Sequence, residues 1–345
     1  MVKVKIFMES NLAHTQQVYT GFSMLRDIGI IDLELVKGDR LSMVSPFIRL
    51  EIEGKSICFD LSDTHEFQSQ ELLNSCDIYF KRMLLKEHET QKIQPYGLNY
   101  PVLYQNDSFV RRGYATGGWK GLVRSFARKN SLLSTLLDIN ISSKNSLVQH
   151  FEQLPRLELA EMGVIFYSRL WNPEKIQDST KRLQRELMNE IRIKAVALLK
   201  QELGSRFIGG IQLDAYSKKV AGNSLVQDNS VVHKKSYLAN LRKSHIGIAT
   251  EGLEESIGFK LAEYMAMSMA IVSNPIDMYS LPGNFEKGIH YLPYTSAEEC
   301  ASQCIRLMED KRMYLNMSVN NMRYYTDYLR PDKLIFNCLI YVLSR

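Results

Sequence analysis

Residues 246–272 read IGIATEGLEESIGFKLAEYMAMSMAIV, and their pattern indicates the fold class of the chain. The run from His245 to Ala249 predicts a buried strand, and Phe259 to Met267 has the apolar spacing of a helix. A second apolar run, Ala270 to Ser273, predicts the next strand. A strand, a helix and a strand in this order predict a parallel sheet with a right-handed crossover.

The same alternation extends in both directions from this stretch. In the second half we predict strands at 163–167 and 206–210 and helices at 178–203, 235–243 and 297–309. In the first half we predict strands at 2–8, 31–37 and 76–80, a helix at 14–28, and a strand pair at 48–60 turned at 53–55. The fold class is therefore α/β, with two Rossmann-like domains.

The length and composition of the chain limit the classes of function that it can have. A length of 345 residues suits two domains, and the net charge of +5 falls well short of a nucleic-acid-binding composition. No run reaches the roughly 18 apolar residues of a membrane span, and the N-terminus has no signal-peptide pattern, so we expect a cytoplasmic protein. Five cysteines without a Cys-x-x-Cys pair predict neither a disulfide framework nor a zinc site.

We expect the turn after Ala249 to contribute to a ligand site, because ligands of open α/β sheets bind at the carboxyl ends of the strands. It places Glu255 before a predicted helix, Gly258 at the helix entry and Glu263 inside the helix. Free N–H groups at a helix start donate hydrogen bonds to a phosphate, and carboxylates accept hydrogen bonds from hydroxyl groups. This arrangement suits a phosphorylated sugar.

The stretch resembles the retaining glycosyltransferases of the group 1 superfamily, whose signature is Glu, seven residues, Glu. Glu255 and Glu263 have this spacing, and Gly258 falls on a loop glycine of the family. The resemblance implies that Glu255 contacts the donor sugar near the reacting carbon and that Glu263 holds the ribose hydroxyls.

The resemblance assigns donor binding to Glu263, Gly258, Ser256, Ile257 and Phe259. The chain departs from the family at three positions. Ser256 stands where Gly or Pro is usual, Ser268 where Gly is usual, and Ala270 where Pro is usual. An isolated pair of glutamates at this spacing also fits the solvated face of a helix.

A second match follows the strand predicted at 163–167. Arg169 and Lys175 resemble the family's Arg and Lys that neutralise the donor diphosphate, although Lys175 lies one residue later than usual. Fixed cations beside a departing diphosphate lower the barrier. An exposed arginine and lysine at the end of a strand are the alternative.

The resemblance implies the GT-B fold, with two Rossmann-like domains facing across a cleft. The predicted domains are 1–155 on the acceptor side, 156–323 for the nucleotide-sugar donor, and a C-terminal helix at 324–345 that crosses back to the first domain.

In the first domain, Asp63 and His65 follow an apolar strand and are candidates for orienting the acceptor. Alternatively, Asp63 or Thr64 caps a following helix. Asp60 and Asp63 are separated by two residues, so they do not form the Asp-x-Asp metal pair of the other large glycosyltransferase fold. We predict neither a metal nor a cofactor.

Residues 111–129 combine basic residues with Trp119, Leu122, Val123 and Phe126. Such a segment fits the inner face of an anionic membrane, as a peripheral contact near a lipid-linked acceptor, or an amphipathic helix packed on its own domain.

The predicted function is a metal-independent glycosyltransferase of the hexosyltransferase type. It would move a sugar from a nucleotide-diphosphate sugar to a hydroxyl acceptor, with retention, in bacterial lipopolysaccharide, capsule or glycolipid synthesis. The acceptor is a saccharide or a lipid-linked saccharide. The alternatives are a GT-B-like protein that binds a nucleotide sugar or a partner without turnover, and a phosphorylase-like enzyme that uses pyridoxal phosphate.

Overall fold

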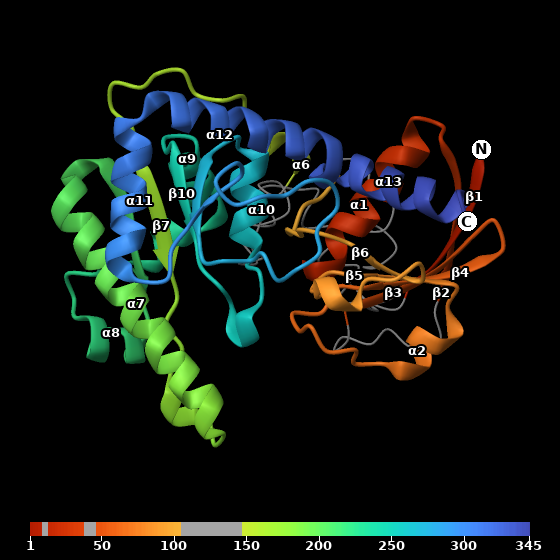
Figure 1. Ribbon diagram of the computed structural model, residues 1–345, viewed down its shortest axis with the longest axis horizontal. Coiled ribbons are helices and arrows are strands. Elements are labelled where there is room, and N and C mark those ends of the chain that lie inside the picture. The colour runs from red at the N-terminus through yellow and green to blue at the C-terminus, as the bar shows by residue number, and fades with distance from the viewer. Residues whose placement is uncertain (9–12, 38–45, 105–146) are drawn as a thin grey trace, which may run out of the picture. The chain divides into compact units, whose positions relative to one another are not determined.

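The computed structural model describes residues 1–8, 13–37, 46–104 and 147–345 of the chain (Figure 1). They divide into two compact units. Unit 1 contains residues 1–151, 279–283 and 326–345, and unit 2 contains residues 152–278 and 284–325. Both units are α/β, so the predicted fold class is confirmed. Nothing in the sequence indicated that residues 279–283 belong to unit 1. The cleft stays a prediction.

Unit 1 is built on a six-stranded mixed sheet in the order β2-β1-β3-β4-β5-β6. Strand β3 is antiparallel to β1 and β4, whereas the other neighbours pair in parallel. The predicted hairpin is confirmed: Glu53 and Gly54 turn it at φ 48° and 81°, as a two-residue hairpin requires. The strands are β1 Val2–Met8, β2 Ile31–Lys37, β3 Phe47–Ile52, β4 Lys55–Asp60, β5 Ile78–Lys81 and β6 Ile93–Pro95.

The C-terminal helix is part of unit 1. Helix α13 packs on α1 so closely that a Cβ on Gly21 would lie 2.3 Å from the carbonyl oxygen of Pro331. The prediction of one helix over 324–345 is wrong: α12 ends at Tyr324, a π-helical turn follows at Tyr325–Leu329, and α13 begins at Pro331. Proline disfavours a helical conformation at the residue before it, and Arg330 has ψ 130°, so a new helix begins at Pro331. The helices of unit 1 are α1 Gln16–Asp27, α2 Gln70–Ser75, α6 Val148–Phe151 and α13 Pro331–Leu343.

Unit 2 is built on a six-stranded parallel sheet in the order β12-β11-β10-β7-β8-β9. From β7 the chain adds strands outward through β8 and β9, then returns to β10 and continues through β11 and β12 on the other side. The order therefore reverses between β7 and β10, which is where doubly wound sheets bind ligands. The strands are β7 Val164–Ser168, β8 Phe207–Gln212, β9 Val226–Gln227, β10 Ile246–Ala249, β11 Ala270–Ser273 and β12 Leu292–Pro293.

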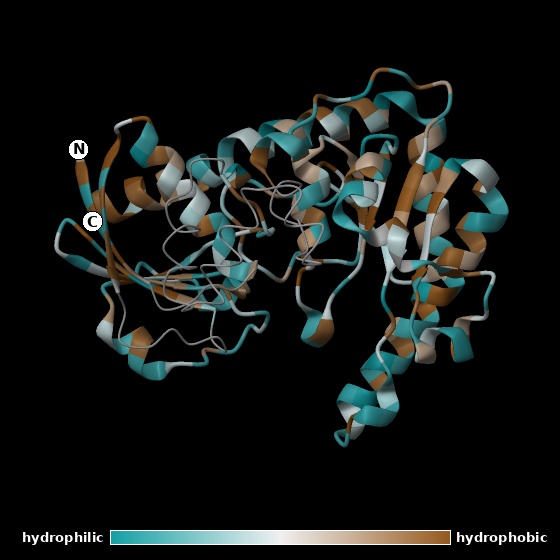
Figure 2. Ribbon diagram, turned by 180° about the vertical axis from the view of Figure 1, so that it is seen from behind, coloured by the Kyte–Doolittle hydropathy of each residue, from teal (hydrophilic) through white to brown (hydrophobic). Residues whose placement is uncertain are grey.

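Helices cover both faces of this sheet. Helices α7 and α11 pack together over one face, and α10 and α12 pack together over the other (Figure 1). Hydrophobic residues concentrate in the strands between these layers (Figure 2). Asp178 caps α7 by accepting a hydrogen bond from the N–H of Lys181, and Gly204, at φ 53°, ends it. The helices are α7 Ser179–Leu203, α8 Ala215–Ala221, α9 Lys234–Leu241, α10 Phe259–Ala266, α11 Ala297–Glu309 and α12 Lys311–Tyr324.

Candidate functional site

Two segments leave the carboxyl ends of β7 and β10 in unit 2, and Arg192 of α7 joins them. The side chain of Arg192 is buried. Its Nη1 donates to the carbonyl oxygen of Arg169 at 2.6 Å, and its Nη2 donates to Thr250 Oγ1 at 3.1 Å and to the carbonyl oxygen of Glu251 at 2.6 Å. One guanidinium therefore holds both predicted donor-site segments at the same edge of the sheet.

A second residue of α7 fixes the segment after β7. Asn189 accepts a hydrogen bond from the N–H of Trp171 at 3.0 Å and donates to its carbonyl oxygen at 2.7 Å. The exposed guanidinium of Arg169 lies 4.6 Å from the centroid of the Trp171 ring. The exposed side chain of Lys175 lies farther along, at the last residue of the 3-10 turn Pro173–Lys175.

The loop after β10 is compact and strained. Glu251 and Ile257 form an antiparallel bridge, and the N–H of Gly252 donates to the carbonyl oxygen of Ser256 at 2.7 Å. Glu254 and Glu255 both have left-handed backbones, at φ 56° and 60°. Each such residue costs about 1–2 kcal/mol relative to an ordinary conformation. The bridge maintains the conformation that presents Glu255 to solvent.

The remaining predicted donor residues lie where the loop meets α10. Ser256 and Ile257 are buried, Gly258 precedes the helix with an extended backbone, and Phe259 begins it. Ser268, where the resemblance led us to expect a glycine, has a left-handed backbone at φ 50°.

Glu263 lies in the middle of α10 and is buried. Lys234 Nζ donates to one carboxylate oxygen at 2.8 Å, and the Tyr237 hydroxyl donates to the other at 2.7 Å. Burial, together with the charge of Glu263, raises the pKa of Tyr237, so its hydroxyl stays a donor. Each carboxylate oxygen keeps a further lone pair, so a ribose hydroxyl could still bind. The ribose role stays a prediction.

Sequence reasoning missed Lys260, the second residue of α10. Its ammonium donates to the carbonyl oxygen of Tyr167, near the end of β7. Burial and the nearby charge of Arg192 lower its pKa to about 8, against the opposing effect of Glu263. Burial also lowers the pKa of Arg192, to about 10. Lys260 looks from sequence like one more polar residue of a helix, and only the fold places it at this edge.

Glu251 is a half-buried carboxylate in the loop after β10, at the carboxyl end of the strands. Burial and the neighbouring charge of Glu255 raise its pKa, and Arg192 opposes that rise. The carboxylates of Glu251 and Glu255 are therefore electrostatic neighbours. Glu254 points elsewhere, to an ion pair with Lys181 at 2.8 Å.

In unit 1, Asp63 accepts a hydrogen bond from His14 Nε2 at 3.0 Å and pairs with Arg82. Burial raises the pKa of Asp63, but the His14 hydrogen bond and the Arg82 charge outweigh it and lower that pKa to about 2. His65, also predicted on the acceptor side, is half-buried. The alternative that Asp63 or Thr64 caps a helix is wrong, because α2 begins only at Gln70 and Ser69 caps it.

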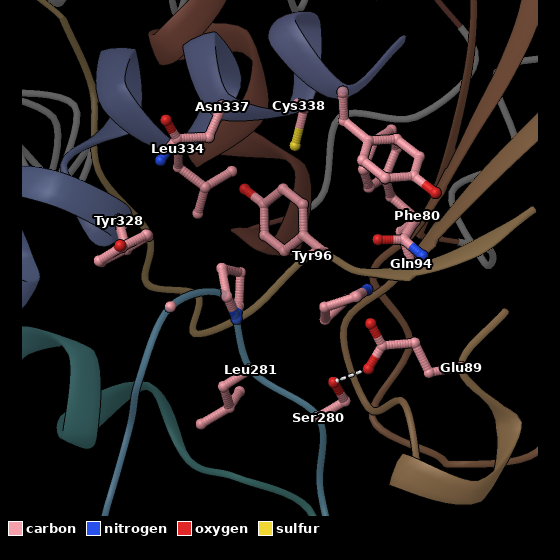
Figure 3. Close-up of a pocket in the computed structure, with 14 residues that line it drawn as sticks. Phe80, Glu89, Gln94, Tyr96, Ser280, Leu281, Tyr328, Leu334, Asn337 and Cys338 are labelled. Carbon is pink, nitrogen blue, oxygen red and sulfur yellow. Dashed lines mark hydrogen bonds between the residues drawn. The ribbon is translucent and has the colours of Figure 1, made fainter. Parts of the chain in front are cut away.

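Unit 1 also contains a cavity of about 450 Å³ that neither Asp63 nor His65 lines. Figure 3 shows Tyr96 between Leu334 and Cys338 of α13 on one side and Leu281 on the other. The Ser280 hydroxyl donates to Glu89 at its rim. Residues 279–283 thus complete a wall of unit 1.

Among the described residues, no cluster of three or more His, Cys, Asp or Glu side chains could hold a metal ion. Metal independence stays a prediction. All five cysteines are free and buried. In the part of the chain that the structure describes, no helix has the length and apolar character to cross a membrane. Residues 111–129 lie outside the described residues.

No protein-family model matches the chain, and neither does any curated protein. Solved structures are similar to it, among them the following three. The C-terminal domain of a glycosyl transferase group 1 family protein (LpcC) from Francisella tularensis is 12% identical over 52% of this chain and 95% of its own, with a TM-score of 0.35. WaaG, a glycosyltransferase involved in lipopolysaccharide biosynthesis, is 10% identical over 76% of this chain and 62% of its own, with a TM-score of 0.38. TarM is 13% identical over 55% of this chain and 37% of its own, with a TM-score of 0.36.

The chain thus spans less than two thirds of WaaG and of TarM. Likeness of this degree carries no conclusion about function, which depends on the contacts of this chain itself.

Proposed function

We propose that the chain is a glycosyltransferase of the GT-B type that moves a sugar from a nucleotide-diphosphate sugar to a hydroxyl acceptor, with retention and without a metal. The observation that supports it is the buried Arg192, which joins the backbone of Arg169 to the loop that presents Glu255. Cations and carboxylates are the two kinds of group that a diphosphate and a sugar require.

In this proposal each residue has a distinct task. Arg169 and Lys175 stabilise the negative charge of the departing nucleoside diphosphate, because fixed cations lower the barrier where charge develops. Glu255 contacts the donor sugar near the reacting carbon. Glu263 holds the ribose, and Gly258 with its neighbours lets the ligand approach the start of α10. The leaving phosphate itself helps deprotonate the incoming hydroxyl, so no strong protein base is needed.

The acceptor side of the proposal rests on unit 1. Asp63 stays charged over the physiological range because its pKa is about 2, so it can accept a hydrogen bond from an acceptor hydroxyl. We include a saccharide or lipid-linked saccharide acceptor, and a peripheral membrane contact through residues 111–129, in the proposal. Bacterial surface-polysaccharide or glycolipid synthesis is its setting.

The decisive experiment is a screen of the full chain against nucleotide-diphosphate sugars, first by thermal shift and then by release of nucleoside diphosphate. Ligand binding to the native state raises the melting temperature. No shift and no turnover with any donor would overturn the proposal.

Two variants then separate a catalyst from a binding protein. Glu255→Gln should abolish transfer while the donor still shifts the melting temperature. Glu254→Gln is the matched control, since it changes the neighbouring left-handed glutamate, which pairs with Lys181. If Glu255→Gln leaves turnover unchanged, Glu255 is not catalytic.

A further inference from the structure

Three cationic residues gather at the carboxyl end of β7. Arg169 follows the strand directly, Arg192 donates to the Arg169 carbonyl oxygen, and Lys260 donates to the carbonyl oxygen of Tyr167. The effect of Arg192 on the pKa of Lys260 shows that these two side chains are close enough to repel each other. They come from three different elements, so the fold alone brings them together.

The carboxylates near these cations act on them only at a distance: Glu263 acts on Lys260, and Glu251 acts on Arg192. Within the described residues, Arg169, Arg192 and Lys260 form no ion pair with a carboxylate, and Arg192 Nε has no hydrogen-bond partner. The nearby carboxylates interact with other charged groups as well. Glu263 forms an ion pair with Lys234, and Glu251 interacts with both Arg192 and Glu255. Arg192 is buried and Lys260 is half-buried. Desolvating a cation without a direct ion pair costs free energy, and an anionic ligand would offset part of that cost.

Resting on the proposed function, we propose that Lys260 binds the diphosphate of the donor and of the departing nucleotide, and that the diphosphate draws a proton onto Lys260 as it binds. The ammonium has three N–H donors, and the Tyr167 carbonyl oxygen takes one. Two remain for phosphate oxygens. The proton comes from solvent, and it leaves again when the nucleotide dissociates.

The proton uptake follows from charge. In the free protein the pKa of Lys260 is about 8, so near that pH about half of the molecules hold the neutral amine. A bound dianion or trianion raises this pKa, because an opposite charge favours the ammonium. Binding near pH 8 should therefore take up as much as about half a proton per site.

Titration calorimetry with inorganic pyrophosphate tests this without knowledge of the nucleotide base. The full chain is titrated near pH 8 in two buffers of different ionisation enthalpy, whose difference in heat gives the number of protons taken up. Lys260→Met should weaken binding about 10-fold to 100-fold. Because pyrophosphate also exchanges a proton near this pH, the share of Lys260 is the difference in net uptake between wild type and Lys260→Met. Lys260→Arg should keep most of the affinity but lack this share, since arginine stays charged.

Lys243→Met is the matched control. Lys243 is exposed and lies beside Gly163, at the amino end of β7, so its loss should change neither affinity nor proton uptake. Circular dichroism checks that each variant is folded. The inference is overturned if wild type does not bind pyrophosphate, or if Lys260→Met binds it with the wild-type affinity or proton uptake.

The outcomes separate this inference from the proposed function. If pyrophosphate binds through Lys260 but no nucleotide sugar is turned over, the glycosyltransferase proposal fails and the anion site stands. If a sugar is transferred but Lys260→Met binds pyrophosphate as wild type does, only the role of Lys260 fails.

Discussion

Nη1 of Arg192 lies 2.6 Å from the carbonyl oxygen of Arg169, a residue 23 positions earlier in the chain. This hydrogen bond fixes the backbone from which the exposed Arg169 side chain leaves β7. The same guanidinium reaches the loop after β10. Arg192 is thus a positioning residue for both halves of the candidate donor site.

We expect Arg192→Met to lower the free energy of unfolding by about 2–4 kcal/mol, because it leaves two backbone carbonyls without their charged donor. Urea unfolding checks this, followed by Trp171 fluorescence in a Trp119→Phe background. Arg185→Met, on the same helix, is the control. An effect no larger than that of the control would show that the two segments hold together without Arg192.

Glu263→Gln should lower the free energy of unfolding by about 1–3 kcal/mol, because the buried glutamate loses its ion pair with the partly exposed Lys234. Chemical denaturation measures this loss, and Tyr237→Phe removes the second contact for comparison. The ribose role is tested on the same variant with the nucleoside diphosphate that the screen selects. A loss of stability without a loss of affinity would leave Glu263 with a structural role only.

The pKa of Lys260 also gives the protein a pH-dependent stability. In the folded state it is about 8 and in the unfolded chain near the ordinary 10.5, so the unfolded state binds more protons between these values. Stability therefore rises with pH across this window, and the full cost of the buried charge is present below about pH 8.

Lys260→Met should lack this rise. Urea midpoints of wild type and variant, measured below pH 8 and near pH 10.5, give the comparison. The other lysines titrate in both proteins, so their effect cancels when the two pH profiles are compared. Parallel pH profiles for the two proteins would contradict the lowered pKa.

Local pattern predicted most of the regular elements. The bounds of Val2–Met8, Ile31–Lys37, Ala270–Ser273 and Ala297–Glu309 agree with the sequence predictions, because alternating or continuous apolar runs and a capping serine are local signals. Strands β9 and β12 have two residues each, too few to show a period.

The candidate site was less predictable than the fold. Glu255, Glu263 and Arg169 stand in a recognisable pattern, whereas Arg192, Lys234 and Lys260 do not. A lysine or an arginine in an amphipathic helix has the same local pattern whether it faces water or a ligand. The difference arises from tertiary contacts, such as the hydrogen bonds of Arg192 to Thr250 and Glu251.

The buried pair of Asp60 and Lys81 in unit 1 provides a test of the acceptor-side structure. Both side chains are fully buried, with Lys81 Nζ 2.9 Å from Asp60 Oδ2. Tyr79 donates to the same oxygen at 2.8 Å, and Ser62 donates to the other. These contacts hold the end of β4, from which the chain continues to Asp63.

Lys81→Met and Asp60→Asn should each lower the free energy of unfolding by about 3–5 kcal/mol, because each leaves one buried charge unpaired. The double variant removes both charges of the pair and leaves neither partner unpaired, so it should lose less than the sum of the two. Urea unfolding of the four proteins completes a double-mutant cycle, with the exposed Lys86→Met as control. Additive losses would mean that the two charges act independently. A strong coupling would instead show that the pair, rather than either residue, maintains the structure that positions Asp63.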